Sequence, residues 1–339
     1  MIVLKGGEVL TEEGWRRADL AIADGRVVTV GSERAPDTVI DVYGCLVGPG
    51  FVDMHTHLRE PGQTWKEDIA SGSAAAAAGG FTAVAAMPNT DPPVDTPKVV
   101  EVISRAAARA GLVEVVPTAA LTMGRAGGVP TDVKHLYELG VRLFTDDGAT
   151  VSDSRVLEEA MLEIAGLPGA FVAQHAEAPG LTIGRHMHEG SVSRDHGLAG
   201  MPAEAEADIV RRDIGLAART GAGYHCQHVS AKMTVELIRQ AKGSGMRVTA
   251  EVTPHHLSFD DTSLAVLDPN FKMYPPLRSP ADRESLIDAL REGIIDVVAT
   301  DHAPHLPVEK EVPFDKAPRG VIGLETAASA VWEALADRD

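Results

Sequence analysis

From residue 49 onward, short apolar runs alternate with longer stretches in which apolar residues recur every three or four positions. The short runs predict β-strands, and the longer stretches predict amphipathic helices. We expect strands at residues 50–54, 83–86, 114–118, 141–145, 171–174, 224–227, 247–251 and 296–300. The clearest helices are expected at residues 97–110, 154–165, 203–220, 231–244 and 280–292. Eight alternating units favour an α/β fold, a parallel (β/α)8 barrel of the TIM type, over an open doubly wound sheet.

The first 48 residues have a different pattern. Short β-type runs at residues 2–4, 18–23, 26–30 and 39–42 are separated by turn residues, and Asp24-Gly25 is a strong hairpin signal. This pattern predicts a small antiparallel sheet. We therefore divide the chain into a small β-sandwich-like domain at residues 1–48 and a barrel domain at residues 49–339.

Composition narrows the classes of partner. Apolar residues make up 44% of the 339 residues, enough for a large core, and the formal net charge is −18. So acidic a chain is not expected to bind nucleic acid or an anionic membrane surface. No apolar run is long enough to cross a bilayer, and the N-terminus lacks the pattern of a signal peptide. The two cysteines, Cys45 and Cys226, cannot form a disulfide framework and fit a reducing cytoplasm.

Chemistry-bearing side chains gather where the predicted strands end. His55 and His57 follow the first barrel strand, and alternate residues of an extended chain point to the same side. Barrel active sites lie at the mouth where strands end and βα loops begin. In chain order, that mouth carries His55, His57, Asn89, Asp146-Asp147, His175, His228 and Asp301. Its four imidazoles, with Asp147 and Asp301, make a full ligand set for two divalent ions.

Each of these residues has a simpler interpretation when it is taken alone. His175 or His228 would more often be an ordinary core or surface histidine, and Asp147 could cap the following helix. Their common placement after successive strands favours the metal site. Asp146 fits a loop-fixing role better than the role of a ligand. The histidines without a partner at the predicted mouth are His186, His188, His225, His255 and His256.

Longer motifs point to a family. They are Asp-Met-His-Thr-His-Leu-Arg-Glu-Pro-Gly at 53–62, Lys-Glu-Asp-Ile at 66–69, Gly-Gly-Phe-Thr at 79–82, Met-Pro-Asn-Thr at 87–90, Phe-Thr-Asp-Asp-Gly at 144–148, Thr-Pro-His-His at 253–256, Thr-Asp-His-Ala-Pro-His at 300–305 and Gly-Leu-Glu-Thr at 323–326. With these motifs the chain resembles class I dihydroorotase, a family of the amidohydrolase superfamily, from the first barrel strand to the C-terminus. The resemblance implies the reversible cyclisation of N-carbamoyl-L-aspartate to L-dihydroorotate plus water, in pyrimidine synthesis.

The resemblance also implies a metal site and a mechanism. His55, His57 and Asp301 would hold one ion, His175 and His228 the other, and Asp147 would lie between the two. Zinc, one or two ions per chain, is the expected metal. Bound zinc lowers the pKa of water from about 15.7 to about 7, which makes hydroxide available for attack on the ring carbonyl. Asp301 would take the proton and pass it to the departing ring nitrogen as general base and acid.

The same resemblance implies a set of substrate contacts. Arg59 would grip the substrate carboxylate with its two-pronged guanidinium, although it could instead form a surface ion pair with Glu60. The full set of expected substrate-binding residues is His57, Arg59, Asn89, Tyr274, His305, Arg319 and Gly320.

Four features depart from the family pattern. Many related barrels carry a carboxylated lysine at the position of Asp147, whereas some class I dihydroorotases have an aspartate there, as this chain does. The aspartate disfavours a hydantoinase or allantoinase, which usually need the lysine. Tyr274 replaces an asparagine that contacts substrate in many relatives, and Arg319-Gly320 replaces a common Phe-Gly. The tail after Gly323-Leu-Glu-Thr326 is short. Relatives return there to complete the N-terminal β domain, so we expect that domain to be incomplete.

Two other functions compete with this interpretation. One is ring opening by another cyclic amidohydrolase of the hydantoinase or allantoinase type. The other is a non-catalytic homologue that scaffolds aspartate transcarbamoylase. Such scaffolds typically lose metal ligands, whereas this chain keeps all six. Association with aspartate transcarbamoylase and a homo-oligomeric state are both possible partnerships for a chain of this family.

Overall fold

The computed structural model of the chain describes residues 1–28 and 36–336. The chain divides into two compact units, Met1–Phe51 and Val52–Asp339. The division falls a few residues after the boundary expected at residue 48. Each unit is described by itself below.

The first unit contains one five-stranded sheet in its described residues. Its strands are β1 (Ile2–Thr11), β2 (Gly14–Ala23), β3 (Arg26–Val28), β4 (Thr38–Asp41) and β5 (Leu46–Val47). Their order is β3-β2-β1-β4, with β5 also paired to β1. The hairpin between β2 and β3 is confirmed, because Ala23 pairs with Arg26 around Asp24 and Gly25, which both have positive φ. Residues 29 and 30 of the strand predicted at 26–30 lie outside the described residues.

The prediction of a purely antiparallel sheet was wrong. β1 pairs with β4 and with β5 in parallel, so the sheet is mixed. Parallel neighbours cannot be joined by a tight hairpin turn, and in the chain β2 and β3 lie between β1 and its parallel partners. Apolar side chains such as Val27, Val39, Ile40 and Leu46 are about half exposed or more. In a β-sandwich a second sheet covers such side chains. That this domain is an incomplete sandwich stays a prediction.

The second unit is a (β/α)8 barrel, as predicted. Its parallel strands are β6 (Phe51–Thr56), β7 (Phe81–Ala86), β8 (Glu114–Pro117), β9 (Leu143–Phe144), β10 (Phe171–Gln174), β13 (Gly223–Cys226), β14 (Val248–Val252) and β15 (Val297–Val298). They form two runs, β6-β7-β8 and β9-β10-β13-β14-β15. Parallel bridges Ala119–Phe144 and Thr56–His302 join the runs and close the ring.

All eight predicted barrel strands are present, but β9 and β15 are only two residues long. Polar side chains replace the ladder at the end of β15. The carboxylate of Asp53, on β6, accepts the Thr300 backbone N–H at 3.1 Å and the Thr300 hydroxyl. The chain can therefore leave the strand early and curve into the loop that carries Asp301.

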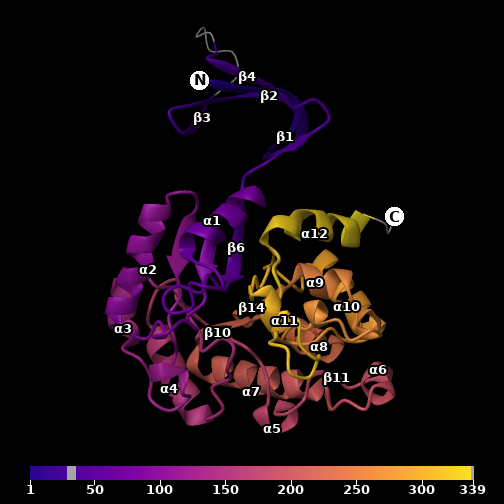
Figure 1. Ribbon diagram of the computed structural model, residues 1–339. Coiled ribbons are helices and arrows are strands. Elements are labelled where there is room, and N and C mark those ends of the chain that lie inside the picture. Colours follow the sequence, from indigo (N-terminus) through magenta and orange to yellow (C-terminus); the bar gives the residue numbers. More distant parts are fainter. Residues whose placement is uncertain (29–35, 337–339) are drawn as a thin grey trace. The chain divides into compact units, whose positions relative to one another are not determined.

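Helices form the outer layer of the barrel (Figure 1). The longer ones are α1 (Ile69–Ala78), α2 (Pro97–Ala110), α3 (Val133–Glu138), α4 (Ser154–Ala165), α7 (Glu204–Thr220), α8 (Lys232–Gly243), α10 (Pro280–Arg291) and α12 (Ala327–Ala336). The bounds of α2 and α4 are those predicted. In α2, Pro97 sits in the first turn, Gly111 ends the helix with φ of 63°, and the side chains of Val99, Val100 and Ile103 face the core.

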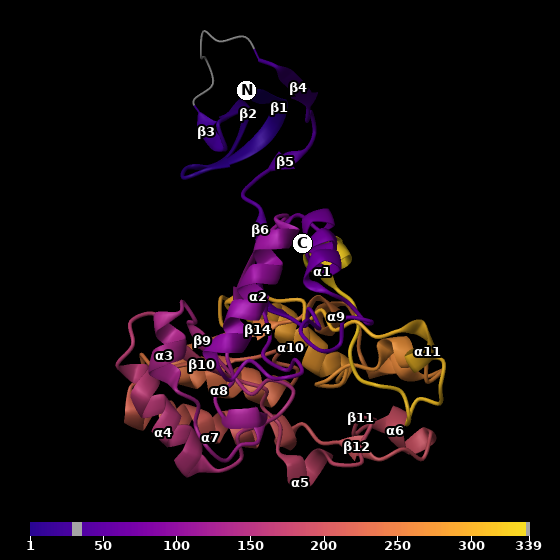
Figure 2. The same ribbon diagram turned by 60° about the vertical axis from the view of Figure 1, so that its left-hand side comes forward.

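Shorter elements lie in the loops. They are α5 (Pro179–Thr182), β11 (Met187–His188), α6 (Ser191–Asp195), β12 (Gly200–Met201), α9 (Pro254–Ser258), α11 (Pro307–Lys310) and the 3-10 turns η1 (Met123–Arg125), η2 (Asp261–Leu264), η3 (Pro269–Phe271) and η4 (Leu324–Thr326). α5, α6 and the β11–β12 pair come together in one region of the barrel unit (Figure 2). Within the described ranges, none of the helices combines the length and apolarity that a bilayer crossing requires.

Candidate metal centre

The structure brings the six sequence-predicted ligand residues into one buried cluster at the C-terminal ends of the barrel strands. His55 lies in β6, and the other five follow β6, β9, β10, β13 and β15. The ligand-atom separations are His55 Nε2–Asp147 Oδ1 3.4 Å, His55 Nε2–Asp301 Oδ1 3.4 Å, His57 Nε2–Asp147 Oδ2 3.4 Å, His57 Nε2–Asp301 Oδ1 2.9 Å, His228 Nε2–Asp147 Oδ1 3.6 Å and His175 Nδ1–Asp147 Oδ1 3.8 Å. Asp147 contacts all four imidazoles, which is the position of a shared ligand.

The donor set fits divalent metal ions. His55 Nε2 and Asp147 Oδ1 are buried and have no hydrogen-bond partner in the described part of the chain. Buried polar atoms without partners are rare in folded proteins, so such atoms facing one another indicate a missing partner. His55, His57 and Asp147 form one group whose ligand atoms converge, and Asp147, His175 and His228 form a second. Imidazole nitrogens and carboxylate oxygens are ligands that zinc and similar ions accept.

Three other side chains hold the imidazoles in orientation. Each occupies the ring nitrogen that points away from the cluster, as the outer partners of metal-bound histidines do. The contacts are His55 Nδ1 with Glu251 Oε1 at 2.6 Å, His57 Nδ1 with Asn89 Oδ1 at 2.8 Å, and His175 Nε2 with Glu177 Oε2 at 3.3 Å. The ring nitrogen left over in each case is the one that faces Asp147.

Glu251 and Glu177 were missed by sequence reasoning, although each had a signal. Glu251 lies in β14 between Ala250 and Val252, where a buried carboxylate needs a partner. Glu177 is two residues after His175, so the two share a face in an extended stretch. Glu251 also accepts the His228 backbone N–H at 3.0 Å and His225 Nε2 at 3.1 Å. His225 is therefore not at the mouth but supports it from the next layer.

Electrostatics favour a cation in the cluster. Burial alone would raise the pKa of Asp147 and of Asp301, but the neighbouring imidazoles, His55 foremost, hold the pKa of both carboxyls well below the usual range. Burial likewise disfavours protonation of His55. The charges of Asp147, Glu251 and Asp301 outweigh that effect and raise the pKa of its ring. Ionised carboxylates thus concentrate negative charge around one imidazole, an environment suited to a metal ion.

Backbone strain is localised at the same mouth. Arg59, His228 and Asp301 have φ angles of 58°, 31° and 48°. Side-chain-bearing residues rarely adopt this left-handed region, and such strain clusters at functional sites. All three strained residues line the cavity beside the cluster.

A small cavity of about 100 Å³ opens over the cluster. Of the expected substrate-binding residues, six line it: His57, Arg59, Asn89, Tyr274, Arg319 and Gly320. His305 does not line this cavity; its Nε2 donates to the Arg319 carbonyl at 2.8 Å. Arg59 donates from Nε to the Pro304 carbonyl at 3.2 Å, and its terminal nitrogens form no hydrogen bond to any described residue. The guanidinium of Arg59 is therefore held in place through Nε, while its two terminal NH₂ groups remain available as donors beside the cavity.

Tyr274 and Arg319, two of the residues that differ from the family pattern, contact each other. The Arg319 guanidinium carbon lies 3.8 Å from the centre of the Tyr274 ring, and that ring is 4.7 Å from the His175 ring. Arg319 also donates to the Arg185 carbonyl at 2.6 Å. Tyr274 and Arg319 thus form one packed wall of the cavity.

Asp146 and His256 have structural partners outside the ligand cluster. Asp146 accepts the Thr122 backbone N–H at 3.0 Å and the Thr122 hydroxyl, so it fixes a loop, as predicted. His256 contacts the Thr253 hydroxyl at 2.6 Å and the Pro275 carbonyl at 3.1 Å. Both side chains stabilise the framework of the mouth and stay out of the ligand cluster.

Comparison with known proteins identifies the family of the chain. A family profile described as "Dihydro-orotase-like" matches residues 44–234. The chain is 46% identical over 329 residues to the dihydroorotase of Anoxybacillus flavithermus, covering 96% of this chain and 77% of that relative. It is 48% identical over 324 residues to the dihydroorotase of Mycobacterium tuberculosis, covering 94% and 75%. The dihydroorotase of Bacillus subtilis (strain 168) is 44% identical over 328 residues, covering 96% and 76%.

Solved structures show the same fold. An L-hydantoinase (dihydropyrimidinase) from Arthrobacter aurescens superposes with a TM-score of 0.80 at 25% identity, covering 97% of this chain and 76% of that chain. A D-hydantoinase superposes with a TM-score of 0.81 at 25% identity, covering 97% and 75%. The curated relatives and these structures are all longer than the chain, which spans about three quarters of each.

Proposed function

The chain belongs to the dihydroorotase-like family, and on that premise we propose that its histidine and aspartate cluster is a two-metal centre for dihydroorotase chemistry. Relatives at 44–48% identity over nearly the whole chain make it a cyclic amidohydrolase with dihydroorotase activity. The reaction interconverts N-carbamoyl-L-aspartate and L-dihydroorotate plus water. The observation that carries the proposal is Asp147, whose two carboxylate oxygens face imidazoles of both ligand groups.

We propose zinc as the ion and His55, His57, Asp301, Asp147, His175 and His228 as its ligands. Donor atoms bonded at 2.0–2.1 Å to a tetrahedral zinc stand roughly 3.3 Å apart. His55 Nε2 is 3.4 Å from the nearest oxygens of Asp147 and Asp301, which supports the first group. When bound, the ions would lower the pKa of a water molecule and polarise the substrate carbonyl.

Asp301 is the proposed general base and acid. Its Oδ1 lies 2.9 Å from His57 Nε2, at the boundary between the cluster and the cavity that it lines. In ring opening, the carboxylate takes a proton from the attacking water and gives it to the ring nitrogen as the C–N bond breaks. In cyclisation the proton moves in the opposite order. Burial alone would raise the pKa of Asp301, but the surrounding imidazoles hold it low, so the carboxylate is ionised.

Arg59 and Asn89 are proposed to orient the substrate. The substrate is an anion, and the free prongs of Arg59 match a carboxylate with two parallel hydrogen bonds. Asn89 uses its amide oxygen for His57 Nδ1, so its NH₂ group remains as a donor toward the cavity. His305 contributes by holding the Arg319 carbonyl, and Tyr274, Arg319 and Gly320 complete the cavity wall.

Two features of the cellular setting are also proposed. We propose a cytoplasmic location, with which the free cysteines Cys45 and Cys226 are compatible, because the cytoplasm is reducing. Association with a second copy or with aspartate transcarbamoylase is a further prediction, to be checked by the size of the complex in solution.

One experiment tests the function directly. The full chain is loaded with zinc, its metal content is measured, and turnover is assayed in both directions with dihydroorotate and carbamoyl aspartate. Hydantoin and dihydrouracil serve as substrates without a carboxylate. We expect turnover of the carboxylate-bearing pair and little of the others. Preferred turnover of hydantoin would indicate a hydantoinase, and a metal-loaded chain inactive on every substrate would indicate a scaffold.

A further inference from the structure

Three consecutive backbone carbonyls beside the catalytic cavity each accept a hydrogen bond from a different basic side chain. The pairs are Lys272 Nζ with Ala317 O at 2.7 Å, Lys310 Nζ with Pro318 O at 2.9 Å, and His305 Nε2 with Arg319 O at 2.8 Å. The next residue, Gly320, donates its N–H to the Lys272 carbonyl at 2.9 Å. We refer to residues 317–320 as the wall segment.

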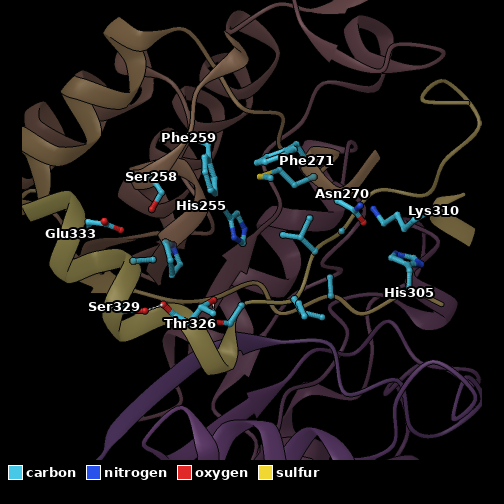
Figure 3. A pocket seen from close by; sticks show the side chains of 18 of the residues that line it. His255, Ser258, Phe259, Asn270, Phe271, His305, Lys310, Thr326, Ser329 and Glu333 are labelled. Carbon is cyan, nitrogen blue, oxygen red and sulfur yellow. Dashed lines mark hydrogen bonds between the residues drawn. The ribbon is translucent and has the colours of Figure 1, made fainter. Parts of the chain in front are cut away.

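The wall segment separates two cavities. Gly320 and Ala303 line the catalytic cavity and also a larger cavity of about 780 Å³. Figure 3 shows Lys310 and His305 near each other on one side of this larger cavity, next to Asn270. Open space on both sides of Gly320 leaves fewer packing contacts to hold this end of the wall segment. The hydrogen bonds to its backbone therefore have a larger share in fixing its position.

The position of the wall segment decides the shape of the catalytic cavity. Gly320 has φ of 126°, and a β-carbon there would lie 2.8 Å from the Ala303 carbonyl oxygen. The backbone at Gly320 therefore packs directly against Ala303, two residues after the proposed acid–base Asp301. Arg319 places its guanidinium over Tyr274 in the same wall. A shift of the wall segment by a fraction of an ångström would move Arg319 and Gly320, which both line the catalytic cavity.

The two lysines are unusual donors. Lys272 is 3% exposed and also donates to the Phe314 carbonyl, and Lys310 also donates to the Pro269 and Lys272 carbonyls. Among residues 1–28 and 36–336, neither ammonium has a carboxylate within ion-pair distance. Burial lowers the pKa of each to about 8, with the charge of Arg319 adding to the effect on Lys272 and the charge of Lys272 to that on Lys310. Since neither ammonium group forms an ion pair with the described residues, its main role is to donate hydrogen bonds to backbone carbonyls.

We propose that Lys272 and Lys310 are positioning residues that clamp the wall segment and thereby set the substrate side of the catalytic cavity. The inference rests on the proposed function for its effect on turnover. Neither lysine belongs to the metal cluster, so the metal content does not depend on the clamp. Loss of a charge-assisted hydrogen bond corresponds to at least about a tenfold change in an equilibrium. We therefore expect a tenfold or larger rise in KM for dihydroorotate, with a smaller change in kcat.

The test uses the zinc-loaded full chain with Lys310→Met, Lys272→Met and Lys310→Arg. Lys316→Met is the matched control, because Lys316 is on the same loop and its side chain is 75% exposed. The first measurement is the KM and kcat for dihydroorotate. The second is the rate of tryptic cleavage after Arg319, followed by mass spectrometry, which reports the order of the wall segment without reference to activity. Lys310 is only partly buried, so Lys310→Met decides the question even where Lys272→Met does not fold.

We expect both Met variants of the clamp to raise KM and to speed cleavage after Arg319 about tenfold, with native metal content. Lys310→Arg should restore most of both values, and Lys316→Met should change neither. Unchanged cleavage in Lys310→Met overturns the clamp, whatever happens to KM. Faster cleavage with native KM overturns its role in positioning substrate. A native chain that does not turn over dihydroorotate refutes the proposed function instead, and the cleavage rates still decide the clamp.

Discussion

Replacement of Glu251 should weaken one metal ion selectively. Its Oε1 accepts from His55 Nδ1 at 2.6 Å and from the His228 backbone at 3.0 Å, and its Oε2 accepts from His225 Nε2 at 3.1 Å. Glu251→Gln keeps an oxygen for the first two contacts. Its amide nitrogen can donate to His225 if that ring moves its proton to Nδ1, where Thr249 Oγ1 lies at 2.8 Å. The variant therefore removes a charge and keeps the hydrogen bonds.

The magnitude follows from the role of Glu251 as the outer partner of His55. Loss of such a partner typically weakens metal binding by about 10- to 100-fold. Because Glu251→Gln retains the geometry, we expect the affinity for the ion held by His55 to fall about tenfold, which corresponds to about 1.4 kcal/mol. Glu251→Ala would instead leave three buried donors without a partner, at about 1–3 kcal/mol each. That sum approaches the whole stability of a typical domain, about 5–15 kcal/mol, so the alanine variant should unfold.

The assay is a competition titration with a zinc chelator that resolves two affinities. Glu177→Gln is the matched control, since Glu177 supports His175 in the other ligand group. Glu251→Gln should lower the tighter affinity and Glu177→Gln the weaker one, while thermal unfolding of both variants stays close to native. The reasoning is refuted if Glu251→Gln leaves both affinities at their native values, or if Glu251→Ala folds and binds two ions as the native chain does.

Three further outcomes are expected. Asp147→Ala should empty the ion at His175 and His228 first, because that group has only two other ligands; metal analysis showing both ions and full activity would mean that Asp147 is not shared. Arg59→Ala should lose at least about tenfold in activity on dihydroorotate at normal metal content, since a charge-assisted contact contributes about 1.5–3 kcal/mol, and equal native turnover of dihydrouracil would contradict this. Burial lowers the pKa of Lys272 from 10.5 to about 8. Between these two pH values the unfolded chain binds one more proton than the folded chain. The free energy of unfolding therefore rises with pH, by at most about 1.4 kcal/mol per pH unit. Urea unfolding at about pH 8 and about pH 10 should show a larger gain for the native chain than for Lys272→Met, and an equal gain would refute the assignment.

The barrel and the ligand cluster were predictable because both depend on local pattern. Each barrel strand is a short apolar run, and a residue just after such a run must lie at the mouth. That reasoning placed His55, His175 and Asp301 without any knowledge of their neighbours. The roles of the clustered residues stay predictions until metal binding is measured.

What the sequence did not reveal depends on contacts between distant segments. Glu251 is 196 positions from His55, and nothing in either neighbourhood links them. The clamp was also invisible, because Lys272 and Lys310 bind backbone carbonyls, which every residue possesses. The mixed first sheet was mispredicted for a related reason: the parallel pairing of β1 with β4 and β5 joins segments that are distant in the sequence, and apolar periodicity does not encode strand direction.

The aspartate at position 147 has a consequence for how the enzyme is assembled. A carboxylated lysine forms only by reaction with dissolved carbon dioxide, so a barrel that uses one depends on a reversible modification before it can hold its metals. Asp147 carries its carboxylate from synthesis, already buried among the imidazoles it would serve. Maturation of this chain would then require metal alone. Metal-depleted protein should regain activity with zinc in buffer purged of carbon dioxide, at the same rate as in air.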